Sequence, residues 1–308
     1  MQPSQTARLA PFFGQFPAEN PIDLNRLSAL AVPVIALLRD VAAAELMPRF
    51  KHVAAERKHD GTIVTEADRA VEAVLARVLP TLFDCPVLGE EMPPEVQQQL
   101  WRDADWLWCV DPLDGTGNFT NGKRYFGISV ALMRRTENRR ESQFGAIFDP
   151  NLNEVFHAVR GRGAWMINSN SETKRLKALP AKPLSEATIE VGRFKLLGRI
   201  KTALSKSADT NSPGKKIISS GASVLQWCHM ACGRVDAFIH AGEQPWDYAA
   251  GALILEEAGG RMATIMHDDY WRSFDAEGAR EGSWQKSAIA ARHPAMFDEW
   301  KRWVRSHH

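Results

Sequence analysis

A buried strand that runs directly into a carboxylate-rich turn is the feature that most constrains how this 308-residue chain folds. The segment is Trp108–Phe119, with the sequence WCVDPLDGTGNF. Its apolar residues deliver Asp111 to the strand end, and Pro112 fixes the backbone so that the chain turns at once. Asp114 can then fold back beside Asp111, with the Leu113 carbonyl between them as a third oxygen. Hard divalent cations such as Mg²⁺ bind oxygen sets of this kind.

The residues that follow the second aspartate suit an anion. Gly115 and Thr116 can direct backbone N–H groups at a phosphate, above all where a helix begins there. Metal ligands beside a phosphate cradle would form a coherent site. Asp, Pro, Gly and Asn are also the usual turn formers, so this segment alone leaves a plain turn as an alternative.

Two further acidic segments strengthen the metal interpretation. Glu90 lies in Gly89–Glu91 (GEE), directly after an apolar pair that indicates a strand end; elsewhere it would be read as part of an exposed acidic pair. Asp247 lies in Pro245–Gly251 (PWDYAAG), at the expected start of a helix. An aspartate there can cap the helix. Capping and metal binding are compatible, because a capping aspartate can still present an oxygen to a cation.

The order of these segments resembles the inositol monophosphatase family of lithium-sensitive, magnesium-dependent phosphatases. GEE, DPLDGTGNF and PWDYAAG correspond to three family motifs, and KHDGTIVTEADRAVE contains the family's upstream VTxxD element. The resemblance covers nearly the whole chain from Lys58 to Gly260. It implies a hydrolase of mixed α+β and α/β class, with the layered α-β-α-β-α sandwich of the inositol monophosphatase and fructose-1,6-bisphosphatase type.

The resemblance also implies a role for each site residue. Two to three Mg²⁺ ions would be held by Glu90, Asp111, the Leu113 carbonyl, Asp114 and Asp247. The Thr116 hydroxyl, paired with Asp68, would help Glu90 orient and deprotonate the attacking water. Without the family, Asp68 would be interpreted as part of a helix start. The substrate would contact Asp114, Gly115, Thr116, Gly221, Ala222, Ser223 and His240.

Elementary chemistry agrees with this arrangement. A phosphate monoester dianion repels hydroxide, so the site must neutralise charge and align the nucleophile with the leaving group. Metal ions do both, and direct attack by a metal-activated water would release phosphate in one step. The mechanism requires no cysteine nucleophile and no catalytic histidine.

The substrate is less defined than the reaction, because the chain departs from the family pattern. His240 stands seven residues before Asp247, where inositol-hydrolysing members usually carry glutamate, and Glu243 is nearby but out of register. His240 is either a structural residue or a substrate contact. We expect an inositol 1-phosphate-like ester, with histidinol phosphate, fructose 1,6-bisphosphate and adenosine 3′,5′-bisphosphate as alternatives.

Periodicity predicts two helices before the metal segment and a chain made of two halves. Helices are expected over 22–47 and over Glu66–Pro80, the second ending at the proline. The first half then mixes helices with antiparallel strands, and the second alternates strands with helices. A polar stretch separates them. We expect an N-terminal α+β domain over 1–168 with most metal ligands, and a C-terminal α/β domain over 169–308 that supplies Asp247.

The composition argues against several other classes of protein. The 38 Lys and Arg balance 37 Asp and Glu, so no dominant attraction to nucleic acid or to an anionic membrane is expected. The most apolar stretch, 27–46, contains Pro33 and three charged residues, which favours a packed helix over a membrane span. The N-terminus lacks the pattern of a secretory signal. Cys228 and Cys232 have no further ligands at fixed spacing, so buried thiols are favoured over a zinc site, as in a cytoplasmic protein.

A second class of function stays open. One bacterial member of the family is a partner of the transcription machinery, so this scaffold could also serve as a binding protein. Four convergent carboxylates argue against a purely non-catalytic role. Family members are commonly homodimers, and some of the ten tryptophans would suit an interface.

Overall fold

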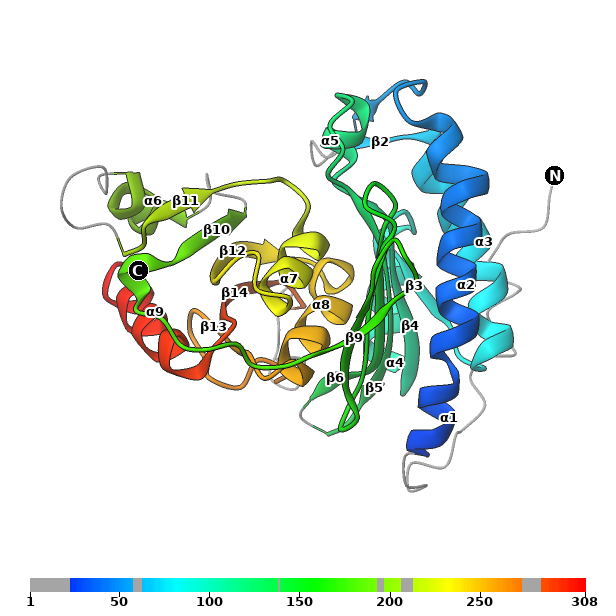
Figure 1. Ribbon diagram of the computed structural model, residues 1–308. Helices are drawn as coiled ribbons and strands as arrows, with labels where there is room; N and C mark the ends of the chain where they lie inside the picture. The colour runs from blue at the N-terminus through cyan, green and yellow to red at the C-terminus, as the bar shows by residue number, and fades with distance from the viewer. Residues whose placement is uncertain (1–22, 58–62, 138, 193–196, 206–212, 273–283) are drawn as a thin grey trace.

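The computed structural model describes residues 23–57, 63–137, 139–192, 197–205, 213–272 and 284–308. The N-terminal segment discussed for a secretory signal and residues 58–62, which begin the VTxxD-containing motif, lie outside the described residues. The fold is layered in the order helix, sheet, helix, sheet, helix (Figure 1). This is the sandwich that the family resemblance implies, so the predicted fold class is confirmed.

The first layer consists of helices from the N-terminal part of the chain. α1 (Leu24–Ala29) begins after Asp23, whose carboxylate accepts hydrogen bonds from two N–H groups of the first turn. α2 (Ala31–Val41) follows, and the chain then forms a π-helical segment, η3 (Ala42–Leu46). The helix predicted over 22–47 therefore has the right position, but it is three consecutive segments rather than one uniform helix.

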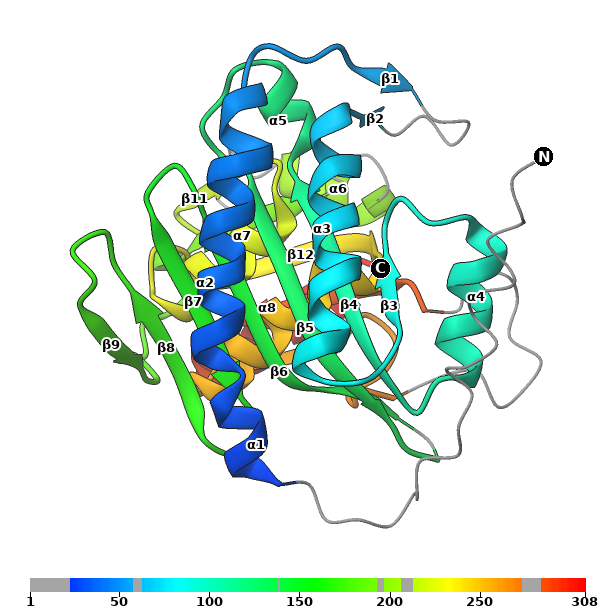
Figure 2. The same cartoon turned by 90° about the vertical axis from the view of Figure 1, so that its right-hand side faces the viewer.

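α3 (Glu66–Leu82) lies beside α2 on the same face of the larger sheet (Figure 2). The prediction that this helix ends at Pro80 is wrong, because the helix continues to Leu82. A proline in the last turn removes one hydrogen bond, but the turn still closes when the Phe83 N–H donates to the Leu79 carbonyl.

The larger sheet has seven strands in the order β3-β4-β5-β6-β7-β8-β9. They are β3 (Val87–Gly89), β4 (Trp106–Asp114), β5 (Gly127–Arg135), β6 (Arg140–Asp149), β7 (Glu154–Val159), β8 (Gly163–Ile167) and β9 (Thr173–Leu176). β3 and β4 are parallel, and the other neighbours are antiparallel. Because β9 pairs with β8, this sheet extends beyond residue 168, the boundary that the sequence predicts between the two domains.

The middle layer consists of α7 (Ser223–Ala231) and α8 (Pro245–Glu257). α8 is buried from Pro245 to Leu255, because it lies between two sheets rather than at the surface. Both helices come from the second half of the chain, yet both pack against β5 and β6 of the larger sheet. The two halves therefore share one hydrophobic core.

The smaller sheet has five strands in the order β11-β10-β12-β14-β13. They are β10 (Thr188–Gly192), β11 (Lys216–Ile218), β12 (Ala237–Glu243), β13 (Arg261–Thr264) and β14 (Lys286–Ala291). The outer helices are α6 (Gly198–Ser205) and α9 (Pro294–Ser306). Shorter elements complete the described chain: η4 (Met47–Arg49), β1 (Glu56–Arg57), β2 (Ile63–Val64), α4 (Pro94–Asp103), α5 (Thr116–Thr120) and η5 (Leu184–Glu186).

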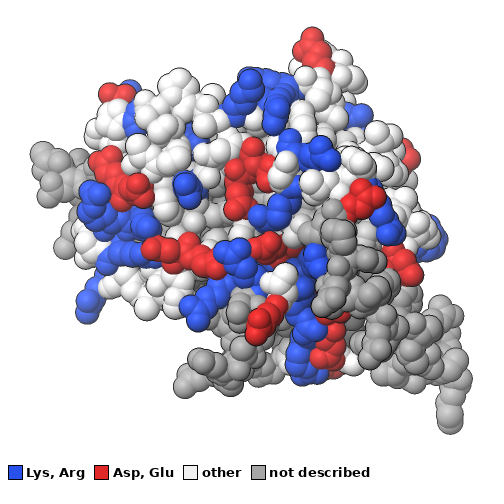
Figure 3. All heavy atoms as spheres, turned by 90° about the horizontal axis from the view of Figure 1, so that it is seen from below, with Lys and Arg blue, Asp and Glu red and all other residues white. Residues whose placement is uncertain are grey.

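The basic run between β5 and β6 is neutralised by local partners. Arg135 pairs with Asp105 at 3.0 Å, and Arg139 pairs with Asp269 at 2.9 Å. Arg140 is buried and donates to backbone carbonyls at the end of α4. Seen from below, the described surface carries Lys and Arg interleaved with Asp and Glu (Figure 3). The arginines at this hairpin are therefore held by ion pairs and by backbone carbonyls of the same protein.

One helical segment of the described chain, Leu24–Arg49, is long and apolar enough to cross a membrane by length and composition alone. Its inward residues, including Leu27, Val34 and Leu38, are buried. An amphipathic helix that covers a sheet has such an inner face, and packing on the larger sheet explains the apolar character of this one.

Candidate metal centre and active site

A β-bulge in β4 brings the first two predicted metal ligands together. Asp111 lies opposite Ser129 and Asp114 lies opposite Gly127, so β4 contains one residue more than β5 between these pairs. In a regular strand, residues three apart point to opposite faces of the sheet. The extra residue removes this difference and lets both carboxylates turn to the same side.

Asp247 reaches the same place from the middle layer. It lies in the first turn of α8, where one carboxylate oxygen accepts a hydrogen bond from the Gln244 N–H at 2.8 Å. Gln244 is the residue that caps the helix, so Asp247 belongs to a capping box rather than being the cap itself. Asp111, Asp114 and Asp247 each offer an oxygen, and these three oxygens lie within 4.8 Å of one another.

The electrostatics of this cluster favour a cation. Burial raises the pKa of the Asp111 carboxyl well above its ordinary value, and nearby carboxylates raise it further. These neighbours are Glu90, Asp114 and Asp247. Oxygen ligands that repel one another in a largely buried place are the donor set that a hard divalent cation binds. The residues present therefore fit Mg²⁺.

Glu90 approaches the cluster from the neighbouring strand. It follows β3, whose last residue, Gly89, lies beside Val110 of β4. The three-aspartate group does not include Glu90, but its charge acts on Asp111. Gln97 of α4 donates to the carbonyls of Gly89 and Glu90 at 2.8 and 3.1 Å, which holds this turn in place.

The predicted partnership of Asp68 and Thr116 is present in the structure. The Thr116 hydroxyl lies 3.2 Å from an Asp68 oxygen and 2.9 Å from the Leu113 carbonyl oxygen. Asp68 is buried and also accepts hydrogen bonds from the N–H and hydroxyl of Thr65, which form a capping box at the start of α3. Burial raises the pKa of Asp68, and these hydrogen bonds oppose the rise. Asp68 therefore serves the helix start and Thr116 together.

Two other predicted residues shape the turn after β4. Leu113 donates its N–H to an Asp111 oxygen at 3.0 Å, and its carbonyl accepts from Thr116. Gly115 has φ +88°, and a side chain there would come within 2.9 Å of the Tyr125 carbonyl. Only glycine suits this position. Gly115 and Thr116 open α5, where their amides are predicted to bind phosphate.

The second half of the chain closes the site against this turn. The Val224 N–H at the start of α7 donates to Asp114 at 2.7 Å, and Asn118 of α5 donates to the Ser220 carbonyl at 2.9 Å. Of the predicted substrate residues, Gly221 lies against Asn118 and Ala222 lies against Gly115. Residues from both halves therefore meet around Asp114.

His240 and Glu243 differ from the expectation. A second bulge lies between them: His240 pairs with Ala288 and Glu243 with Lys286. The extra residue lets the two side chains lie on the same face of β12, although Glu243 stays closer to α8 along the strand. Glu243 is fully buried and accepts hydrogen bonds from the Ser223 hydroxyl at 2.9 Å and from the Trp227 indole at 3.0 Å.

His240 itself is largely buried, at 5% exposure, and its ring occupies the space above Gly192.

Glu243 is a neighbour of the site that sequence reasoning missed. Burial, followed by the charge of Asp247, raises the pKa of Glu243 well above its ordinary value. Gly242, directly before it, was the available signal, because glycine within a strand often marks a bulge.

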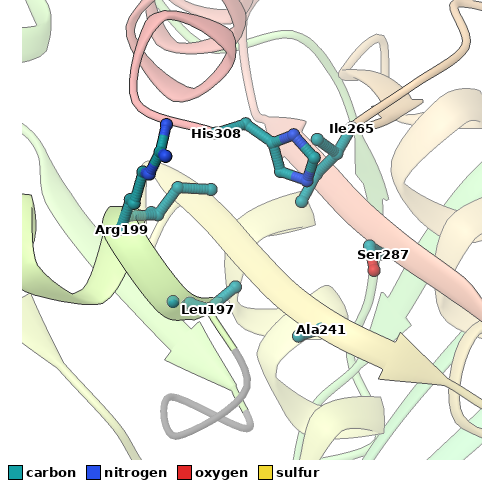
Figure 4. Close-up of a pocket in the computed structure, with 8 residues that line it drawn as sticks. Leu197, Arg199, Ala241, Ile265, Ser287 and His308 are labelled. Carbon is teal, nitrogen blue, oxygen red and sulfur yellow. The ribbon is translucent and has the colours of Figure 1, made fainter.

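The cysteines are not members of the three-aspartate cluster, although Cys109 lies on β4 two residues before Asp111. Cys85, Cys109 and Cys228 are buried, and burial raises their thiol pKa values. Within the described ranges, the group of possible metal ligands contains aspartates alone. A cavity of about 250 Å³ lies beside the C-terminus, with Arg199, Ala241 and His308 on its wall (Figure 4). It contains none of the predicted site residues.

Comparison with known proteins gives a consistent result. A model of the inositol monophosphatase family matches residues 23–296. Inositol monophosphatase 2 of Solanum lycopersicum is 34% identical over 219 residues, which cover 69% of this chain and 77% of the relative. Nus factor SuhB of Escherichia coli (strain K12) is 32% identical over 209 residues, covering 68% and 74%.

Solved structures share the fold. An IMPase of Thermotoga maritima superposes with a TM-score of 0.72 at 27% identity, over 90% of this chain and 97% of the other. An IMPase/NADP phosphatase complexed with Mg²⁺ and phosphate has a TM-score of 0.66 over 90% and 96%. At 21% identity, the second likeness concerns the fold alone.

Proposed function

The chain belongs to the inositol monophosphatase family, and on this premise we propose that it is a Mg²⁺-dependent phosphomonoesterase acting on a small phosphorylated alcohol. The observation that supports this most strongly is the convergence of Asp111, Asp114 and Asp247 within 4.8 Å. The cluster lies beside the turn at Gly115 and Thr116, where a phosphate would be bound.

The proposed metal ligands are Glu90, Asp111, the Leu113 carbonyl, Asp114 and Asp247, for two to three Mg²⁺ ions. Bound Mg²⁺ would neutralise the phosphate dianion and make water a stronger nucleophile. Thr116 and Asp68 would orient that water. When the Thr116 hydroxyl donates to Asp68, a lone pair of its oxygen can accept a hydrogen bond from water. Glu90 would receive the water proton.

A screen of phosphate esters tests the proposal and identifies the substrate. The set should contain inositol 1-phosphate, histidinol phosphate, fructose 1,6-bisphosphate and adenosine 3′,5′-bisphosphate, with inorganic phosphate as the readout at fixed Mg²⁺. We expect hydrolysis of at least one ester, with the inositol ester preferred. No release from any member of the set would contradict the proposed activity. Repeating the assay with Li⁺ tests the sensitivity expected of the family.

His240 is proposed to decide substrate preference. We expect His240→Glu to raise kcat/KM for inositol 1-phosphate relative to glycerol 2-phosphate, because a carboxylate can accept hydrogen bonds from two vicinal hydroxyls, whereas a neutral imidazole has one acceptor. The control is the melting temperature, because the His240 ring packs above Gly192. Equal changes for the two esters would mean that His240 is structural.

A second proposed role is binding to the transcription machinery, and the relative named Nus factor SuhB favours it. We also propose a cytoplasmic homodimer, from the reduced cysteines and the family resemblance. A pull-down at physiological salt, with and without Mg²⁺, tests binding to the transcription machinery. Light scattering of the purified protein tests the dimer.

A further inference from the structure

Glu72 is a buried carboxylate that the mechanism above does not use. It lies on α3 and is 8% exposed. We propose that Glu72 is a positioning residue that fixes the turn after β3 and thereby sets the Glu90 carboxylate for Mg²⁺. This inference rests on the proposed metal site and adds to it a residue that holds a ligand in place.

Glu72 contacts that turn at two positions. Its carboxylate accepts a hydrogen bond from the Glu91 N–H at 2.9 Å. It also occupies the space that a side chain at Gly89 would fill, so even a methyl group there would overlap it. Gly89 does not have a positive φ, so the absence of a side chain here matters because it leaves room for the Glu72 carboxylate. Glu72 therefore packs against the residue before Glu90 and accepts a hydrogen bond from the residue after it.

The opposite side of the turn is held by α4. Gln97 donates to the carbonyls of Gly89 and Glu90, whereas Glu72 accepts from the following N–H. The Glu90 backbone is thus held from two helices. Its side chain is then directed from a fixed base toward Asp111, on which its charge acts.

Residues of α3 contact the turns after both strands that carry predicted metal ligands. Asp68 and Glu72 are four residues apart and therefore lie on the same face of the helix. Asp68 contacts Thr116 in the turn after β4, and Glu72 contacts the turn after the adjacent parallel strand β3. Carboxylates that hold metal ligands through hydrogen bonds commonly change metal affinity by 10- to 100-fold when they are removed.

Calorimetric titration of the metal-free protein with Mg²⁺ tests the inference. We expect Glu72→Ala to weaken Mg²⁺ binding by about 10- to 100-fold. Glu72→Gln should retain most of the affinity, because its amide oxygen can still accept from the Glu91 N–H. Glu66→Gln is the matched control on the same helix, since the Glu66 side chain is 77% exposed, and it should bind Mg²⁺ like the wild type.

Two further measurements separate positioning from a merely structural role. At saturating Mg²⁺, kcat of Glu72→Ala should return close to the wild-type value, while half-saturation by Mg²⁺ stays shifted. Gly89→Ala should weaken Mg²⁺ binding as well, because its methyl group displaces the Glu72 carboxylate, and it provides the test if Glu72→Ala does not fold.

Unchanged Mg²⁺ affinity in Glu72→Ala and Gly89→Ala would overturn the inference. A fall in the kcat of Glu72→Ala that saturating Mg²⁺ does not restore would also overturn it. The proposed function is judged separately. If the wild-type protein binds Mg²⁺ but releases no phosphate, the proposed phosphatase activity is contradicted. The calorimetric comparison would still decide the role of Glu72.

Discussion

Replacing Asp111 with asparagine is expected to lower kcat/KM at least about a thousandfold, which corresponds to about 4 kcal/mol of transition-state stabilisation. Asp111 is the most buried member of the three-aspartate cluster and one of the predicted Mg²⁺ ligands. The fold should survive, because an asparagine oxygen can still accept the hydrogen bond from the Leu113 N–H. Initial rates at saturating Mg²⁺, with circular dichroism as the folding control, test this expectation.

The same substitution should stabilise the metal-free protein at neutral pH. The pKa of Asp111 is raised in the folded state, so the folded protein binds this proton more tightly than the unfolded chain, where the pKa is about 3.9. Ionised Asp111 therefore destabilises the fold, and its cost grows as the pH rises above about 4. Asparagine carries no such cost.

Melting temperatures in EDTA between pH 5 and pH 8 measure this effect. The variant should melt higher than the wild type at pH 8, and the difference should shrink as the pH falls. Added Mg²⁺ should favour the wild type, because a ligand that binds the folded state stabilises it. A variant that melts lower than the wild type at pH 8 in EDTA would contradict the electrostatic description of the cluster.

Thr116→Ala is expected to lower kcat by about 10² to 10⁴ with little change in Mg²⁺ affinity. The methyl group cannot donate to Asp68 or accept from water, so the nucleophile loses its orientation. Thr116→Ser, which keeps the hydroxyl, is the matched control and should retain most of the activity. Steady-state rates over a range of substrate and Mg²⁺ concentrations separate these parameters.

A higher KM with unchanged kcat would show that Thr116 binds substrate without orienting water. The structure gives a reason to expect the other result. The hydroxyl lies between Asp68 and the carbonyl of Leu113, which is itself a predicted metal ligand, and so it belongs to the part of the site where the water would be placed.

The chemistry of the site could be predicted from the sequence because its residues lie in short motifs. Asp111 and Asp114 are separated by only two residues, and the nature of the donors indicates a hard cation. What the motif could not reveal is why both carboxylates face the same side. The shared orientation depends on a bulge in β4, where its register with β5 shifts. The position of such a bulge is decided by pairing with the partner strand rather than by the local sequence.

The roles of residues that act through packing between distant segments could not be predicted from the sequence. Glu72 acts through the contact of α3 with the turn after β3, and Glu243 depends on the bulge within β12. The edge strand β9 lies in a polar stretch without alternating apolar residues, because one side of an edge strand has no neighbour to pair with. Pro80 does not end α3 as predicted, because a proline in the last turn removes only one hydrogen bond.

We propose that Asp111, Asp114 and Asp247 bind Mg²⁺ for phosphate-ester hydrolysis. The most direct test measures phosphate release from inositol 1-phosphate and glycerol 2-phosphate with EDTA-stripped protein, before and after Mg²⁺ is added back. The account predicts no activity above background in EDTA and full recovery with Mg²⁺. Full activity in EDTA would contradict it.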